Sequence, residues 1–195
     1  MSIQPTPPLE IEVDKLITRK RYCDTPAETV YSVVRNNLDH LAPFMVWARP
    51  TYSADDYRTN VESARERWGE SGEQGYGIFL NSEFSGAIGI RGFESPVRAV
   101  SIGYWLSKEV QGRGIMTRSV AALIRIAFET YGMNQVIIRA APENTRSRAI
   151  PERLGFTQVG IERQMSMNAS GEYLDLVGYS LLRAEWDEQR SRTST

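Results

Sequence analysis

The chain has 195 residues, of which 41% are hydrophobic and 24% charged, so it is long enough to bury the core of one globular domain. Its formal net charge of -1 excludes a protein that binds nucleic acid through a global basic field. One cysteine, Cys23, excludes an internal disulfide, and one histidine, His40, leaves too few soft ligands for a zinc site. Without a signal peptide or ~20 consecutive apolar residues, the chain is expected to be cytoplasmic, with no membrane partner.

The two ends of the chain differ in composition from its middle. Residues 1–12 contain three prolines and are expected to form a disordered or loosely held tail. Residues 188–195 are mostly polar or charged and are expected to fray. Because no repeat or linker divides the rest, residues 13–187 are expected to form a single domain.

The first third of this domain predicts one strand and two helices. The strand is expected over residues 16–22, where apolar and polar residues loosely alternate. Thr25 and the proline after it predict the start of a helix that carries valines at helical spacing as far as Leu38. After an irregular aromatic loop, a second helix is expected over residues 53–68, with Ser53 as its N-terminal cap.

The middle of the chain predicts an antiparallel meander followed by a long helix. Strand-like runs at residues 75–80, 83–93 and 97–106 are separated by short segments with turn residues. From residue 115 to residue 131 the apolar residues recur at helical spacing, and Gly132 follows at the usual C-terminal position.

The last third predicts a buried strand, a short helix and two further strands. The apolar run 136–141 is typical of a central strand covered on both faces. Asn144 can cap a helix ending at Gly155, and the final strands are expected over residues 156–167 and 173–182. A strand, a helix and a strand in succession imply one parallel pair among antiparallel neighbours. The expected fold class is therefore α+β, with a mixed, mostly antiparallel sheet and helices on its faces.

The most informative segment is Gln111-Gly112-Arg113-Gly114, between a strand and the long helix. The first N–H groups of a helix lack internal partners and carry partial positive charge. Gly112 and Gly114 let the backbone approach a ligand closely and adopt positive φ, and Arg113 adds a formal charge. The loop thus predicts a phosphate or pyrophosphate site, although glycines needed only for tight helix packing are the alternative. No P-loop string occurs, and Thr117 and the mid-chain position disfavour a Rossmann fingerprint.

This loop resembles the Gln/Arg-x-x-Gly-x-Gly/Ala motif of the GNAT acetyltransferase superfamily. Within that superfamily the chain resembles the Rim-type branch of ribosomal-protein N-acetyltransferases, through residues 38–45, 102–106, 143–149, 152–156 and 179–183. The resemblance covers residues 13–187, with the motifs in the correct order. One departure is Met116, where the motif has glycine or alanine.

The resemblance implies the GNAT fold, in which the parallel strands, here 101–106 and 136–141, splay apart. It also implies acetyl-CoA as co-substrate, with no metal. The pantetheine arm would pair with the backbone near Tyr104, and the pyrophosphate would lie on the N–H groups that follow Gln111. The implied cofactor-binding residues are Tyr104, Trp105, Leu106, Gln111, Gly112, Arg113, Gly114, Ile115, Met116, Thr117, Asn144 and Ser147.

Two residues are candidates for the chemistry. Asn144 and Ser147 match the family pattern Asn-x-x-Ser, which implies that Ser147 lies near the sulfur as a proton donor; otherwise both are ordinary first-turn residues. No general base stands out among Glu83, Glu94, Glu172 and Asp175, which lie on or near strands that could border the acceptor. Asp175 fits best, because the branch often has an acidic residue or histidine on that segment. A surface charge on an edge strand, or a water chain in place of a base, is the alternative.

The acceptor is expected to be a primary amine, contacted by His40, Phe44 and Trp47 unless these residues only pack beneath their loop. The Rim resemblance suggests a protein N-terminus. A small amine (an antibiotic, polyamine or amino-acid derivative) and a catalytically silent acyl-CoA-binding module are alternatives. An acidic groove with a narrow mouth would favour a small cation, and an open groove a peptide. A homodimer is expected by analogy with relatives.

Two further residues stand out. Pro151 lies inside the last predicted helix, where it should kink the helix or leave the carbonyl of Ser147 without a donor. Cys23 is expected to be a small buried residue near the end of a strand.

Overall fold

The computed structural model describes residues 8–15, 17–67, 73–93 and 96–193. In these residues eight strands form one sheet, in the order β1-β2-β3-β4-β5-β6-β8-β7. The strands are β1 (Glu10–Glu12), β2 (Ile17–Arg21), β3 (Gln74–Leu80), β4 (Glu83–Arg91), β5 (Ala99–Leu106), β6 (Gln135–Ala140), β7 (Thr157–Met167) and β8 (Tyr173–Leu182). The α-helices are α1 (Ala27–Arg35), α2 (Leu38–Leu41), α3 (Ala54–Arg67), α4 (Ile115–Arg125), α5 (Thr145–Arg153) and α6 (Arg183–Thr193).

The pairing of β5 with β6 is the feature that positions the site. All other neighbouring strands are antiparallel, whereas these two are parallel and pair from Ala99 only as far as Ile102, opposite Ile138. Beyond that point β5 stays with β4, and β6 stays with β8. The mixed sheet and its splayed central pair are therefore confirmed.

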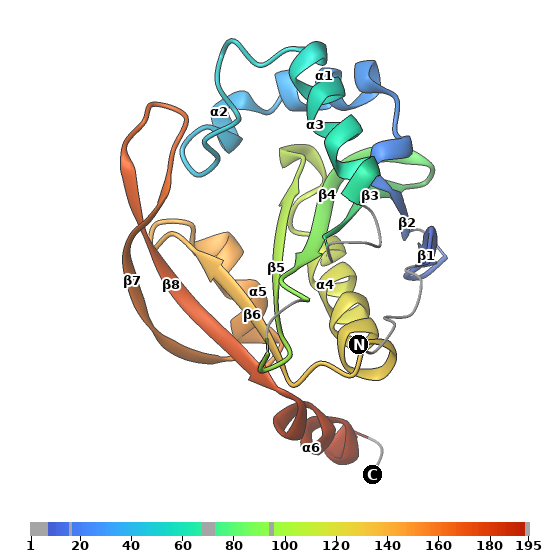
Figure 1. Cartoon of the computed structure of the whole chain (residues 1–195), viewed down its shortest axis with the longest axis vertical. Coiled ribbons are helices and arrows are strands. Elements are labelled where there is room, and N and C mark those ends of the chain that lie inside the picture. The colour runs from blue at the N-terminus through green and yellow to red at the C-terminus, as the bar shows by residue number, and fades with distance from the viewer. Residues whose placement is uncertain (1–7, 16, 68–72, 94–95, 194–195) are drawn as a thin grey trace.

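Helices cover both faces of the sheet, as expected (Figure 1). On one face α4 buries Val120, Leu123 and Ile124 in the larger core, and a π-helical turn at Ile126–Thr130 continues it. On the other face α1 and α3 cover a second core that contains Cys23, which is buried as expected. None of the helices in the described ranges has the length and apolarity needed to cross a membrane.

Two of the three predicted helix caps are present. Ser53 N donates to Asp56 Oδ2 at 2.8 Å and Asp56 N donates to Ser53 Oγ at 3.1 Å, a reciprocal capping box. Asn144 accepts from the backbone of its own helix. The prediction for Thr25 was wrong, because α1 starts after Pro26 without a side-chain cap, and Leu38 belongs to the separate helix α2.

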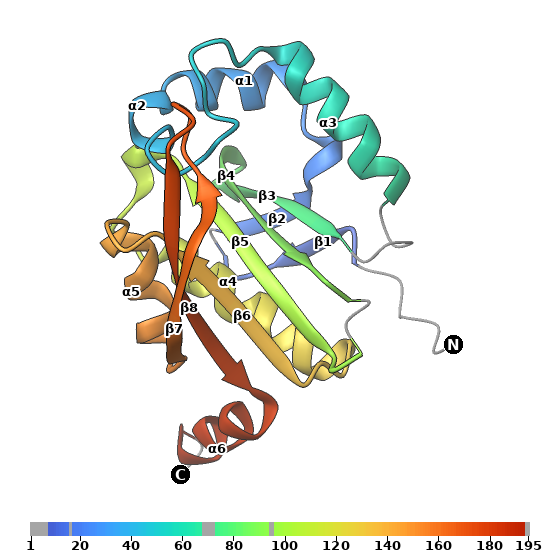
Figure 2. The same ribbon diagram turned by 60° about the vertical axis from the view of Figure 1, so that its left-hand side comes forward.

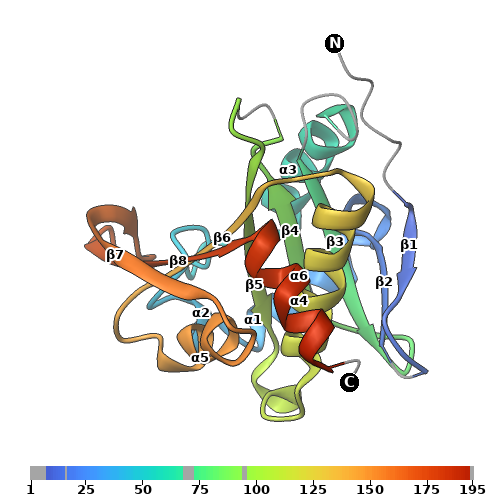
Figure 3. The ribbon, with the colours of Figure 1, turned by 90° about the horizontal axis from the view of Figure 1, so that it is seen from below.

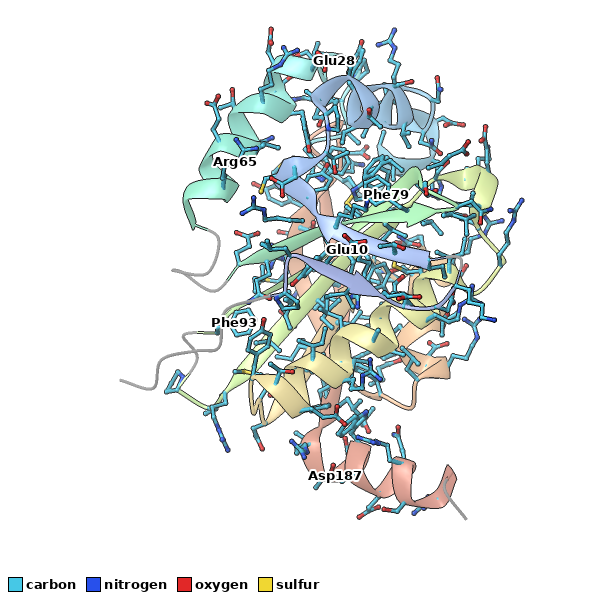
Figure 4. All side chains as sticks on the ribbon, turned by 90° about the vertical axis from the view of Figure 1, so that its right-hand side faces the viewer. Glu10, Glu28, Arg65, Phe79, Phe93 and Asp187 are labelled. Carbon is cyan, nitrogen blue, oxygen red and sulfur yellow. The ribbon has the colours of Figure 1, made fainter. Side chains whose placement is uncertain are left out.

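Part of each predicted tail forms regular secondary structure. Within the expected tail 1–12, β1 pairs with β2 and buries Ile11, while residues 1–7 lie outside the description. Within the expected frayed end, α6 runs to Thr193 and is held by Trp186, whose ring lies 5.2 Å from that of Phe128. Figure 4 shows Glu10 on β1 and Asp187 on α6.

Strands β7 and β8 form a long hairpin that curves away from the other strands (Figures 1 and 3). Its turn reaches the other side of the splay, where Ala169 N donates to Ala42 O, just after α2, at 3.0 Å (Figure 2). The hairpin therefore bridges the open end of the sheet.

Candidate active site

The splay opens into a cleft of about 1010 Å³. Its walls come from the second half of β5, the end of β6 and the helix α5. It is also lined by the start of α4, by α2 and the loop that follows it, and by β8. The cleft thus joins a helix N-terminus to an open strand face.

At the start of α4, the backbone offers a row of N–H groups. Gly112 and Gly114 have φ of 76° and 69°, a conformation that favours glycine, and no side chain caps α4. In the described structure no hydrogen bond engages the N–H groups from Gly112 to Thr117. Free N–H groups at a helix start suit a diphosphate, in agreement with the sequence prediction.

The cations around this loop differ from the expectation. Arg113 is exposed and is not among the residues that line the cleft. It therefore offers the diphosphate site its backbone N–H group and not its guanidinium group. The lining arginines at this end are Arg118, Arg146 and Arg153. Arg153 lies 3.3 Å from Thr117 Oγ1, and Arg118 is paired with Asp14 at 2.8 Å. These three guanidinium groups add positive charge beside the free amides.

Gln111 ties the loop to β5 and to α2. Its side-chain amide donates to Leu106 O at 3.2 Å, accepts from Arg146 at 2.7 Å and contacts His40 Nε2. Burial, and then the charge of Arg146, lower the pKa of His40, so the neutral ring accepts from Gln111. His40 also lines the cleft, and its contact with Gln111 supports the loop.

In the middle of the cleft, Asn144 and Ser147 come together with Tyr104 of β5. Asn144 Oδ1 accepts from Ser147 N at 3.2 Å, which fixes the first turn of α5. The Tyr104 hydroxyl donates to Ser147 O at 3.0 Å, and Ser147 Oγ lies 3.4 Å from the same phenol oxygen. All three residues line the cleft, so a hydroxyl group faces the point where the strands part.

In the loop after α2, Phe44 lines the cleft, but Trp47 does not. The Trp47 ring packs 6.0 Å from Trp105 and 5.6 Å from Tyr52, within the second core. Its predicted acceptor role was therefore wrong, because the loop turns this side chain inward. Gly103 is exposed there, with nothing within 4 Å of where a Cβ would lie.

Asp175 is not in the cleft, and its predicted role as general base was wrong. Successive side chains of a strand point to opposite faces, and Leu174 and Leu176 line the cleft. Asp175 consequently points to the other face, where its Oδ1 accepts from Gln164 N at 2.8 Å. Gln164 has φ of 53° and lies in an irregular stretch of β7, which the carboxylate stabilises.

The sequence analysis missed a carboxylate beside the cleft. Glu162 of β7 pairs with Arg139 at 2.7 Å, and Arg139 lines the wall opposite Gly103. The pairing of β7 with β8 shifts register after Glu162. No alternation in the sequence reveals which way this side chain points, because almost all of β7 is exposed.

Comparison with known proteins agrees with this geometry. Residues 24–157 match the family model described as an acetyltransferase (GNAT) domain. A putative ribosomal N-acetyltransferase of Bacillus subtilis (strain 168), YdaF, is 33% identical over 180 residues, covering 92% of this chain and 98% of its own.

Solved structures have the same architecture. A probable acetyltransferase is 34% identical, with a TM-score of 0.83 over 91% of this chain and 98% of its own. The ribosomal L7/L12 alpha-N-protein acetyltransferase RimL, in complex with coenzyme A, has a TM-score of 0.82 over 89% of this chain and 97% of its own. At 24% identity this second likeness bears on the fold alone.

Proposed function

The chain belongs to the GNAT acetyltransferase family and is an acetyl-CoA-dependent N-acetyltransferase. From this premise we propose that its acceptor is the N-terminal amine of a protein. One observation carries the assignment of the cofactor site: β5 parts from β6 after Ile102, and the free N–H groups that begin at Gly112 lie at the end of the cleft so formed. In our proposal these N–H groups hold the diphosphate, and the free edge from Tyr104 to Leu106 pairs with the pantetheine arm.

The proposed reaction needs few groups. The neutral amine attacks the thioester carbonyl carbon, the C–S bond breaks, and the thiolate takes the proton of the Ser147 hydroxyl. The proton that the attacking nitrogen then loses returns through water to the Ser147 oxygen. Asn144 has its amide N–H2 available for the pantetheine arm, since its oxygen is engaged with the helix. The products are the acetylated amine and coenzyme A.

The charges of the cleft support a peptide over a small polycation. Among the described residues that line it there is no aspartate or glutamate, whereas its lining includes Arg91 and Arg139. A polyamine or aminoglycoside would find no carboxylate to pair with in this lining, since the neighbouring Glu162 is already paired with Arg139. The relative YdaF, described as a putative ribosomal N-acetyltransferase, also favours a protein acceptor.

An acceptor panel tests this proposal. We expect kcat/KM for short peptides with a free N-terminus to exceed that for spermidine and aminoglycosides on the order of 10²-fold. An N-terminally blocked peptide containing lysine controls for side-chain acetylation, and release of free thiol measures the rate. A preference for the polycations would contradict the proposal. Binding of acetyl-CoA without turnover of any amine would instead identify a silent acyl-CoA-binding module.

The incoming ammonium must lose a proton, and we propose that Glu162 accepts it, through water. The ion pair with Arg139 keeps the carboxylate at the wall of the cleft. We expect Glu162→Gln to lower kcat on the order of 10²-fold near neutral pH, with partial recovery at high pH, where more of the amine is already neutral. Glutamine can still accept from Arg139, so the wall is preserved. A pH–rate profile identical to that of the wild type would exclude Glu162.

We also propose that the enzyme acts in the cytoplasm as a homodimer. The exposed β7 edge carries apolar side chains that a second copy would cover, namely Val159, Ile161 and Met165. Sedimentation velocity measures the oligomeric state.

A further inference from the structure

Pro151 lies in the second turn of α5, inside the helix that carries Ser147. In an uninterrupted α-helix the N–H of residue 151 would donate to the carbonyl of residue 147. Proline has no N–H group, so this carbonyl is left without its helical donor. The structure supplies a different donor, the Tyr104 hydroxyl, at 3.0 Å from Ser147 O.

The phenol is suited to this bond because it keeps its proton. Burial raises the pKa of Tyr104 to about 12, although the bond with Ser147 opposes the shift. A protonated phenol donates once, here to Ser147 O, and its oxygen can then accept from Ser147 Oγ, which lies 3.4 Å away. Both contacts of Tyr104 are therefore with the same residue of α5.

These contacts cross the gap that the splay leaves. Past Ile102 and Ile138 no strand pairing joins β5 to β6 in the described chain. Tyr104 projects from the free half of β5, and α5 packs against β6. The hydroxyl thus links the two walls of the cleft at the level of Ser147.

We propose that Pro151 is a positioning residue for acetyl transfer. By withholding an N–H from Ser147 O, it leaves that carbonyl to Tyr104, and the phenol in turn sets the direction of the Ser147 hydroxyl and the width of the cleft. The inference rests on the proposed function, in which Ser147 protonates the departing thiolate. A proline retained only for helix rigidity would affect stability and leave kcat unchanged.

Pro151→Ala restores the N–H, and Tyr104→Phe removes the hydroxyl while keeping the ring. We expect each single variant to lower kcat about five- to tenfold, the effect of one hydrogen bond, with KM for acetyl-CoA within about twofold of the wild type. The double variant should be no slower than Tyr104→Phe, because both changes break the same link. Hydrogen exchange on Pro151→Ala should show that the amide introduced at position 151 is protected.

Two results would overturn the inference. In the first, Pro151→Ala has the kcat of the wild type although its new backbone amide is protected from exchange. In the second, the losses of kcat in the two single variants add fully in the double variant. If Pro151→Ala does not fold, a kcat for Tyr104→Phe equal to that of the wild type would also overturn the inference. Ser147→Ala separates this inference from its premise. A normal rate in that variant removes Ser147 from the proposed mechanism, whereas an inactive Ser147→Ala beside normal Pro151→Ala and Tyr104→Phe removes only the role of Pro151.

Discussion

Ser147→Ala is expected to lower kcat by about 10²- to 10⁴-fold without unfolding the protein, because it removes a positioned proton donor and little else. The backbone of residue 147 would keep both of its observed bonds. Its N–H donates to Asn144 Oδ1, and its carbonyl accepts from Tyr104. KM for acetyl-CoA should change little, since the free amides at the start of α4 are untouched.

Thiol release under saturating substrates measures this effect, and thermal melting checks the fold. Ser147→Thr is the matched control, because it retains a hydroxyl at the same carbon and should recover part of the rate. A melting temperature near that of the wild type, combined with a near-normal kcat in Ser147→Ala, would show that solvent protonates the thiolate instead.

The sheet was predictable from the sequence because its strands have clear signals. The meander up to Leu106 and the apolar strand that ends at Ala140 are long, apolar and bounded by turns. The ends were not predictable, for two different reasons. β1 has only three residues and gains its order from pairing with β2. α6 shows no strong apolar stripe, and Trp186 docks it on the core.

Some features of the candidate site could likewise be predicted from the sequence, and others could not. Backbone features follow local sequence, so the positive φ of Gly112 and Gly114 and the cap at Asn144 were foreseen from residue type. Side-chain direction depends on tertiary structure. The side chain of Arg113 is exposed and does not line the cleft, and Asp175 lies on the opposite face of its strand.

The hydrogen bond from the Tyr104 hydroxyl to Ser147 O shows what the sequence and the structure each reveal. The sequence alone revealed that Pro151 would leave a carbonyl without a donor, because that follows from the chemistry of proline. It could not reveal which group would replace the donor, because Tyr104 is 43 residues away from Ser147 along the chain. Local chemistry therefore predicted the unpaired acceptor, and only the fold identified its partner.

Gly112→Asp is expected to raise KM for acetyl-CoA about 10- to 100-fold while leaving kcat at saturation nearly unchanged. The new carboxylate would stand beside the free amides and repel the diphosphate; two unit charges about 5 Å apart near a protein surface interact by about 3 kcal/mol, which solvent reduces. The side chain has room, because nothing lies within 4 Å of a Cβ at this position.

Gly112→Asn isolates the charge, because asparagine has the same shape as aspartate and tolerates the positive φ of 76° about as well. The KM difference between the two variants should shrink in 1 M salt, where the Debye length falls to about 3 Å. Both steric hindrance and backbone strain would affect the two variants equally and would not depend on salt. If aspartate and asparagine raised KM to the same extent, the diphosphate would have to bind elsewhere, and the amides at the start of α4 would lose their proposed role.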